Sequence, residues 1–318
     1  MTIMQDLSSR IRNYFKIRIN YLFCPVNQIF DYTSIEFMDD SKEKRILDEL
    51  NPSKYQENLI FTTYFCSKPD RQKKEVIESD NFEYIKKFYE SVKSHNLHAV
   101  IFYDNLSDDF IRRYNCRNVK FVKSRVIKYS LNDERFLIYS EFLDQVKPQK
   151  IILSDGNDVI FGKNPFEFIK DSKFYIGRDH YCLNKHSEWI QMKINILPKE
   201  VRENIPSLFY EMPLVNAGVL GGNYATLVDF LKKVVILIRF VDNDQNHNMA
   251  IVNIVFFDSF WIDYNTSWIT KVKFLITKDR NKLAVQPTIY NDKFHLGKPF
   301  TSHFFKFEKD NGSYIYHK

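Results

Sequence analysis

Two aspartates stand three positions apart where an apolar run of the sequence ends. The run at 151–154 leads directly into Asp155, Gly156, Asn157 and Asp158. Hard divalent cations such as Mg²⁺ and Mn²⁺ take oxygen ligands, and proteins often hold them with one or two carboxylates plus the oxygens of a substrate diphosphate. Gly156 would let a bulky ligand approach the backbone closely. The spacing therefore predicts a cation and diphosphate site at Asp155 and Asp158.

A surface turn is the alternative interpretation of this stretch, because Asp, Gly and Asn all favour turns. An EF-hand calcium loop is excluded, since no acidic residue falls at the twelfth loop position when either aspartate is taken as the first. The flanking apolar runs favour the metal site, because they place the acidic pair at the carboxyl end of a strand.

The elements that must position this pair alternate along the chain. We expect strands at 59–65, 99–103, 119–122 and 150–154, with helices at 82–94, 108–114 and 133–146 between them. This alternation predicts an α/β fold with a mostly parallel, Rossmann-like central sheet flanked by helices. Ligands of such sheets bind at the carboxyl ends of the strands, where the acidic pair follows the fourth strand.

The alternation loosens in the second half of the chain. We expect strands at 174–177 and 214–220 around a helical insertion at 179–213, then helices at 223–239 and 244–257. No internal repeat or Gly/Ser linker divides the sequence. We therefore expect a single catalytic domain at 51–318, preceded by an N-terminal helical extension at 1–50.

Composition narrows the class of function. The 318 residues include 46 basic and 40 acidic ones, a net charge of +6, which favours small anionic partners and not nucleic acid.

The longest apolar runs are far below the roughly 20 residues needed to cross a bilayer. The four cysteines form no C-x-x-C pair, so buried thiols in a reducing compartment are expected. We expect a cytoplasmic protein whose basic and aromatic segment 10–21 is a solvated helix face or, alternatively, a contact to an anionic membrane surface.

The ordered motifs resemble those of the GT-A glycosyltransferases, in which a strand-terminal Asp-x-Asp or Asp-x-x-Asp binds the manganese of a nucleotide-sugar. The stretch 215–220, Val-Asn-Ala-Gly-Val-Leu, is similar to a strand of the glycogenin and lipopolysaccharide galactosyltransferase family, family 8. Asp244-Gln245 with a downstream Asn is similar to that family's Asp-Gln motif. The Asp-x-x-Asp form also resembles the glycosyltransferase domain of collagen lysyl hydroxylases. The resemblance spans 58 to about 306 and implies a GT-A fold.

The same resemblance implies a reaction. The expected activity is hexosyl transfer from a nucleotide diphosphate sugar, with a UDP-sugar as the expected donor, to a hydroxyl acceptor with retention of anomeric configuration. Mn²⁺ or Mg²⁺ is the implied cofactor. A glycan, a glycolipid or a hydroxylated protein side chain remain open as acceptors. Trp189, Phe209 and Tyr210 of the insertion would overhang the donor and offer aromatic faces to a sugar ring.

A histidine motif near 295 is similar to the family's His-x-x-Gly-x-x-Lys-Pro-Trp, although its spacing is compressed. The resemblance implies that His295 completes the metal shell and that Lys298 touches the diphosphate, with His303 as the alternative metal ligand. A core-edge histidine is the other interpretation of His295.

Further residues are implied to bind the donor. Arg135 stands where the family carries an arginine facing the donor, and its fork of N–H groups suits a diphosphate or sugar hydroxyls. A surface ion pair with Glu134 or Glu141 is the alternative. The remaining donor-binding candidates line the first strand, the acidic turn and the later strands: Thr62, Thr63, Tyr64, Gly156, Asn157, Asn216, Ala217, Gly218 and Arg178.

The implied catalytic residues are Asp244 and Gln245, which would flank the anomeric carbon; Asp244 could instead cap the helix that follows it. An inverting enzyme would need Asp244 or Asp179 as a base near the acceptor hydroxyl. Two other functions stay open. A nucleotidyltransferase is disfavoured because the basic loop at 66–74 has no glycine to cradle phosphate. A non-catalytic protein that binds nucleotide-sugars is the second alternative.

Overall fold

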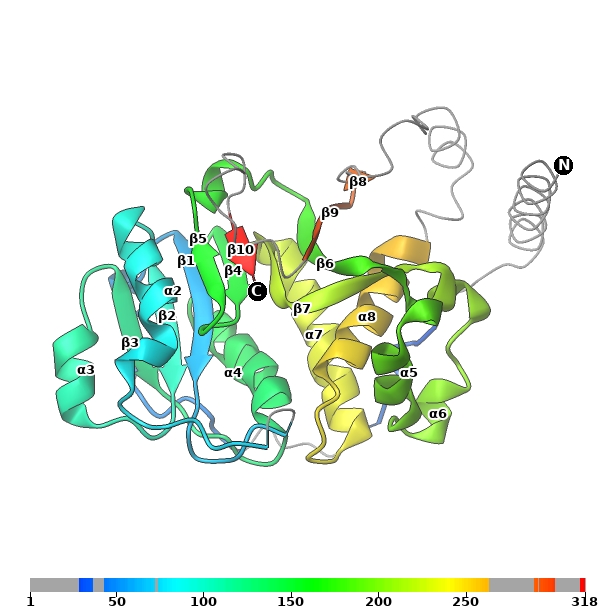
Figure 1. Ribbon diagram of the computed structural model, residues 1–318, viewed down its shortest axis with the longest axis horizontal. Coiled ribbons are helices and arrows are strands. Elements are labelled where there is room, and N and C mark those ends of the chain that lie inside the picture. Colours follow the sequence, from blue (N-terminus) through cyan, green and yellow to red (C-terminus); the bar gives the residue numbers. More distant parts are fainter. Residues whose placement is uncertain are drawn as a thin grey trace, which may run out of the picture.

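The central sheet has eight strands among the residues that the computed structural model describes, which are 29–36, 43–71, 74–262, 289–290, 292–300 and 315–317 (Figure 1). The strand order is β3-β2-β1-β4-β7-β6-β9-β8. Strands β3, β2, β1 and β4 pair in parallel, β7 runs against both its neighbours, and β6 and β9 pair in parallel again. The sheet strands are β1 (Asn58–Tyr64), β2 (Ala99–Tyr103), β3 (Val119–Lys123), β4 (Lys150–Ser154), β6 (Phe174–Leu183), β7 (Pro213–Asn223), β8 (Ile289–Tyr290) and β9 (Phe294–Phe300).

Helices cover both faces of the sheet, and each face has its own apolar core. Side chains of β1 alternate between the two cores: Phe61 packs on one side, Ile60 and Tyr64 on the other. One face is covered by α2 (Phe82–Ser94) and α3 (Asp108–Tyr114), and the other by α4 (Leu131–Gln145), α7 (Tyr224–Val241) and α8 (Asn248–Phe256). The expected α/β class with a mostly parallel sheet flanked by helices is confirmed.

Polar caps explain where several helices begin. Asn81, Ser107, Ser130 and Asn223 each accept a hydrogen bond from a backbone N–H in the first turn of the helix that follows. Such caps satisfy N–H groups that have no partner within the helix. The expected helices at 82–94 and 108–114 and the strands at 99–103 and 150–154 agree with the observed bounds.

The insertion between β6 and β7 is helical, as expected, although β6 continues as a strand to Leu183. It contains α5 (Glu188–Asn195), α6 (Lys199–Arg202) and the 3-10 turns η3 (Asn184–His186) and η4 (Ser207–Glu211). Helix α8 begins at Asn248, later than the expected start at 244, and leads into the π-helical turn η5 (Phe257–Trp261). Two further 3-10 turns are η1 (Pro52–Lys54) and η2 (Pro165–Glu167).

A small second sheet pairs two segments far apart in the sequence. Strand β5 (Val159–Phe161) follows the acidic turn, and β10 (Ile315–His317) lies antiparallel beside it. The sequence predicted neither strand, since each has only three residues. Their pairing brings the carboxyl-terminal part of the chain next to the end of β4 (Figure 1).

Part of the expected N-terminal extension is docked on α4. Glu141 accepts hydrogen bonds from the backbone N–H groups of Arg45 (2.9 Å) and Ile46 (3.0 Å), and the buried Arg45 guanidinium pairs with Glu134. The domain boundary at residue 50 stays a prediction. The membrane-surface candidate at 10–21 lies outside the described residues.

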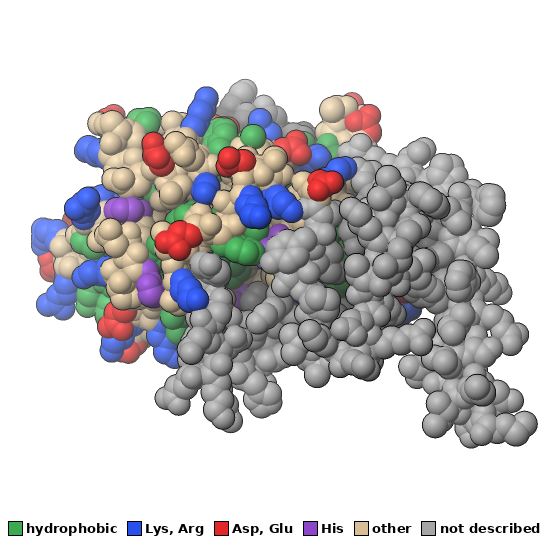
Figure 2. All heavy atoms as spheres, turned by 90° about the horizontal axis from the view of Figure 1, so that it is seen from above, with side chains coloured by type: hydrophobic (Ala, Val, Ile, Leu, Met, Phe, Trp, Pro, Cys, Tyr) green, Lys and Arg blue, Asp and Glu red, His purple; other side chains and the backbone are tan. Residues whose placement is uncertain are grey.

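The helices and surface charges of the described residues bear on the sequence expectations on membrane crossing and on charge. Within the described part of the chain, no helix is both long and apolar enough to span a bilayer. On the face seen in Figure 2, basic and acidic side chains are interspersed over the described residues. This mixture agrees with the modest net charge.

Candidate metal centre

Asp155, Asp158 and His317 bring three metal-ligating side chains together at the carboxyl end of β4. One ligand atom of each lies within 4.8 Å of the others. His317 Nε2 is 3.3 Å from Asp155 Oδ2 and 3.5 Å from Asp158 Oδ1. Two carboxylates and an imidazole suit a divalent cation such as Mn²⁺, which accepts both oxygen and nitrogen ligands. The donor set therefore fits a metal ion at this position.

Backbone pairing places these ligands. The Asp155 N–H donates to the Gly218 carbonyl oxygen (2.8 Å), which continues the β4–β7 pairing one residue beyond β4. Strand β5 starts directly after Asp158, and His317 of β10 lies opposite Val159. The histidine thus reaches the acidic turn because β10 adds to the strand that follows that turn (Figure 1).

Two glycines leave room beside the centre. A Cβ atom at Gly218 would come within 2.5 Å of Asp155 Oδ2 and 2.8 Å of Asn216 Oδ1, and closer still to the His317 ring. A Cβ atom at Gly156 would lie 2.8 Å from Thr62 Oγ1. Only glycine fits these two positions without displacing a neighbour, and Gly218 is the one on which both metal-ligating groups converge.

Arg135 joins the centre through an ion pair with Asp155. It also donates a hydrogen bond to the Ala217 carbonyl oxygen (3.1 Å), and its side chain is buried. Burial alone would raise the pKa of Asp155, but the positive charge of Arg135 and the hydrogen bond from His317 outweigh it and lower that pKa. The alternative pairings of Arg135 do not occur, because Glu134 pairs with Arg45 and Glu141 binds backbone N–H groups.

The carboxylates favour positive charge at His317. Burial would lower the pKa of this imidazole, but hydrogen bonds to Asp155 and Asp158 and their negative charges raise it to about 10. A positive charge placed between the two carboxylates is therefore strongly stabilised. A bound divalent cation would supply that charge and displace the proton.

His295 is not brought to this centre, which corrects the expectation that it completes the metal shell. It lies on β9, separated from β4 by β7 and β6 in the strand order. The buried ring packs against Phe168 (4.8 Å between centroids) and Tyr175 (5.1 Å), and burial together with the charge of Lys173 lowers its pKa to about 4. The sequence pattern indicated the histidine of the compressed motif, whereas the pairing of β10 with β5 places His317 beside the two aspartates. His303 and the side chain of Lys298 lie outside what the structure describes.

Asp244 and Gln245 lie in the exposed loop between α7 and α8. Asp244 pairs with Arg71, and the Gln245 N–H donates to Asn243 Oδ1 (2.9 Å). Asp244 is not among the residues that converge on the metal centre, and it does not cap α8, which begins at Asn248. A catalytic role for the pair stays a prediction.

The nucleoside candidates on β1 flank the centre. Thr62 is fully buried beside Gly156, and Thr63 is half-buried. The Tyr64 hydroxyl lies 2.7 Å from the Glu78 carbonyl oxygen, and its ring packs against Tyr84 of α2 (4.9 Å between centroids). Burial, together with the smaller effect of the charges of Asp155 and Asp158, raises the pKa of Tyr84.

Three other donor-binding candidates have clear positions. Asn216 Oδ1 accepts a hydrogen bond from the Gly218 N–H. Asn157 is half-buried in the acidic turn. Arg178 is buried on β6 opposite Val215 of β7. The sequence reasoning missed His317 and Tyr84, since neither stands in a motif.

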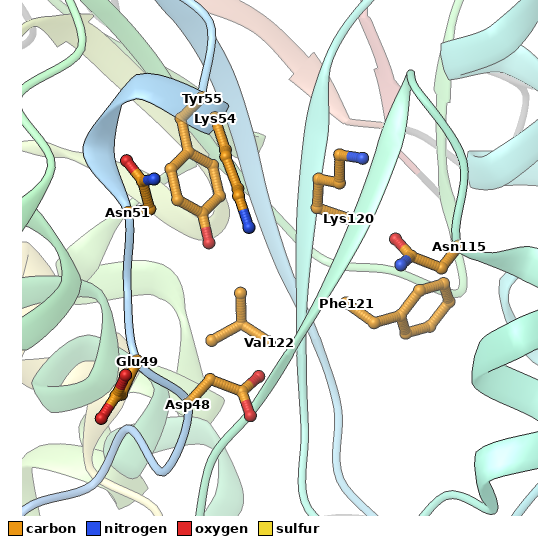
Figure 3. Close-up of a pocket in the computed structure, with 9 residues that line it drawn as sticks. All are labelled: Asp48, Glu49, Asn51, Lys54, Tyr55, Asn115, Lys120, Phe121 and Val122. Atoms are coloured by element: carbon orange, nitrogen blue, oxygen red, sulfur yellow. The ribbon is translucent and has the colours of Figure 1, made fainter.

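A separate groove of about 380 Å³ lies at the β3 edge of the sheet (Figure 3). It contains none of the metal-ligating residues. Its lining combines polar side chains from the segment before β1 with residues on and before β3: Asp48, Glu49, Asn51, Lys54, Tyr55, Asn115, Lys120, Phe121 and Val122.

Comparisons with known proteins find no protein-family model and no curated protein that match the chain. Among solved structures, the galactosyltransferase LgtC in complex with donor and acceptor sugar analogues is similar, with 14% identity and a TM-score of 0.38. An active-site mutant of LgtC is similar with 15% identity and a TM-score of 0.39. Each match covers 63% of this chain and 70% of the LgtC chain.

Proposed function

We propose that the protein is a metal-dependent GT-A glycosyltransferase that moves a sugar from a nucleotide diphosphate sugar, with a UDP-sugar as the first donor class to test, to a hydroxyl acceptor with retention. The convergence of Asp155, Asp158 and His317 carries the proposal. It lies at the carboxyl end of β4, the edge at which open α/β sheets bind their ligands. The sequence resemblance supplies the reaction class.

The three ligands would hold Mn²⁺ or Mg²⁺, which neutralises charge on a departing diphosphate when bound. Arg135 holds the Asp155 carboxylate through their ion pair, so that this ligand keeps one orientation. Gly218 keeps the space beside both ligands open. The chain's own residues thus fix the position at which leaving-group charge is stabilised.

The donor would extend from this centre over neighbouring strand ends. Thr62 and Thr63 lie near the end of β1 beside Gly156, and Tyr84 packs on Tyr64, the last residue of β1. An aromatic pair beside an acidic centre suits a nucleobase attached to a metal-bound diphosphate. On the other side, Asn216 would face the sugar.

The acceptor would enter from the side of the insertion between β6 and β7. Trp189 of α5 is half-buried and has the Lys193 ammonium 5.8 Å from its ring centroid. An aromatic face with nearby polar groups suits a sugar or another hydroxylated acceptor. A glycan, a glycolipid and a hydroxylated protein side chain are the acceptor classes to test.

Donor hydrolysis tests this function without a known acceptor. UDP-glucose and UDP-galactose are incubated with Mn²⁺, with and without a chelator, using the wild type and the double variant Asp155→Asn/Asp158→Asn. We expect hydrolysis that is lost with the chelator and in the double variant. The exposed pair in α3, Asp108→Asn/Asp109→Asn, is the matched control and should keep full activity.

Other outcomes separate the alternatives. Formation of UTP and a sugar 1-phosphate from the UDP-sugar when pyrophosphate is added, in place of release of a nucleoside diphosphate, would indicate a nucleotidyltransferase. Tight nucleotide-sugar binding without turnover would indicate a non-catalytic binding protein. Full activity of the double variant would contradict the proposed metal centre.

A further inference from the structure

The part of β7 that borders the metal centre leaves the regular sheet. Strand β4 pairs with β7 from Val219 onward, and one further backbone bond joins Asp155 to Gly218. On the other side, Ile176 of β6 lies opposite Leu220, yet the next residue, Gly177, lies opposite Asn216. The three β7 residues between Asn216 and Leu220 therefore bulge out of the β6 register. A bulge next to a site re-aims the backbone, and its polar groups need other partners.

Two side chains of α8 supply partners for β7 just before the bulge and at its first residue. Asn253 is fully buried; its Oδ1 accepts from the Val215 N–H (2.9 Å), and its Nδ2 donates to the Val215 carbonyl oxygen (2.8 Å). The Ala217 N–H donates to Met249 Sδ (3.1 Å). Asn253 thus binds both the N–H and the carbonyl of Val215, as a neighbouring strand would, and Met249 accepts a hydrogen bond from the N–H of Ala217.

The stretch held in this way is bonded directly to the metal-centre residues. The Ala217 carbonyl accepts from Arg135, which pairs with Asp155. The Gly218 carbonyl accepts from the Asp155 N–H (2.8 Å). Val215 lies two residues before Ala217 and three before Gly218, so a displacement of Val215 would reach Asp155 through these two contacts.

We propose that Asn253, assisted by Met249, is a positioning residue: it holds the β7 bulge so that Gly218 stays clear of the metal position while its carbonyl fixes Asp155. This inference rests on the proposed function of the centre. Asn253 touches β7 and its own helix, and acts on the metal ligands only through Val215–Gly218. Helix α8 thereby contributes to the site through its buried face.

A purely structural amide is the competing account, because Asn253 also donates to the Met249 carbonyl oxygen (2.8 Å) within α8. Loss of a buried amide lowers stability wherever it lies. The two accounts differ in what happens at the centre. A structural role predicts a lower Tm alone, whereas positioning predicts altered metal ligation at a given stability.

The experiment compares Asn253→Leu and Met249→Leu with Asn184→Leu. Asn184 is likewise fully buried, and its Nδ2 donates to the Phe209 carbonyl oxygen (3.1 Å), which lies outside β7. Met249→Leu keeps the side-chain volume and removes only the sulfur acceptor. We therefore expect this variant to fold even in the case that Asn253→Leu does not. The readouts are Tm, Mn²⁺ affinity by electron paramagnetic resonance, donor kcat and KM, and amide hydrogen exchange without metal.

For Asn253→Leu we expect Mn²⁺ affinity to fall about tenfold or more, kcat to fall more than KM rises, and exchange at the Asp155 and Ala217 N–H groups to accelerate about tenfold. Met249→Leu should show the same pattern more weakly, with acceleration confined to Ala217. Asn184→Leu should lower Tm alone. Wild-type values at the centre in both α8 variants, or the same losses in Asn184→Leu, would overturn the inference.

The exchange measurement separates this inference from the proposed function. If the wild type binds no Mn²⁺, the metal centre fails. Accelerated exchange in Asn253→Leu but not in Asn184→Leu would still support the hold on the bulge, and equal exchange in both would defeat it.

Discussion

His317 Nε2 lies 3.3 Å from Asp155 Oδ2, although one residue follows β4 in the middle of the chain and the other belongs to β10. The contact exists because β10 pairs with β5, the strand directly after the acidic turn. A three-residue strand thereby completes a group of three side chains that could hold a metal ion, which the acidic turn alone could not form.

The two aspartates differ in their structural partners, which predicts unequal costs of removal. Asp155→Ala leaves the buried Arg135 without its ion-pair partner, whereas Asp158→Ala leaves that pair intact. Breaking a fully buried ion pair costs about 3–5 kcal/mol, and the partial exposure of Asp155 reduces this cost. We therefore expect Asp155→Ala to lower the free energy of unfolding by about 2 kcal/mol more than Asp158→Ala does. Urea unfolding of the metal-free variants measures this difference. Equal losses would contradict a stabilising role for the Arg135–Asp155 pair.

Gly218→Ala should abolish metal binding while a similar change elsewhere does not. The added methyl group would overlap the His317 ring and the Asp155 carboxylate. Gly297→Ala on β9 is the matched control, since its Cβ would meet neighbours only at 3.4 and 3.5 Å, ordinary contact distances. Mn²⁺ titration of both folded variants tests this. Unchanged Mn²⁺ affinity in Gly218→Ala would show that the three groups do not close on one cation.

Local pattern was enough to predict most of the fold around the first four sheet strands. The apolar run at 99–103 and the capped helix at 82–94 have the expected bounds, because each is a strongly patterned element with a polar boundary. The acidic turn after β4 was also placed correctly at the strand end. These features depend on residues close in sequence.

The histidine of the site could not be predicted in this way. His317 stands in a three-residue strand with no motif, and only its pairing with β5 gives it meaning. His295 lay in a motif-like stretch, but β9 joins the sheet beside β6, so its ring packs on Tyr175. The long-range pairing of β10 and of β9, which a single sequence does not display, determines that His317 and not His295 lies beside the two aspartates.

Asp133 predicts a pH-dependent component of stability. Burial, opposed by hydrogen bonds such as that from the His247 N–H, raises the pKa of this carboxyl from 3.8 to about 7. Between these values the folded protein retains a proton that the unfolded chain has released. This contribution to stability is therefore lost as the pH rises from about 4 to 7, and the loss is complete above pH 7.

Asp133→Asn should remove that dependence. Relative to the wild type, the variant should gain stability steadily between pH 5 and about pH 7 and little more by pH 8, as measured by urea unfolding at several pH values. The exposed Asp144→Asn is the control and should follow the wild type. A constant stability difference between Asp133→Asn and the wild type at all these pH values would refute a protonated Asp133.

The central claim is that Asp155, Asp158 and His317 hold one divalent cation. Titration of the folded protein with Mn²⁺, followed by electron paramagnetic resonance, tests it in the wild type, His317→Ala and His295→Ala. The structure predicts that His317→Ala weakens Mn²⁺ binding by about 100-fold, whereas His295→Ala, which loses only ring contacts to Phe168 and Tyr175, binds as the wild type does. Wild-type affinity in His317→Ala together with a loss in His295→Ala would contradict the account.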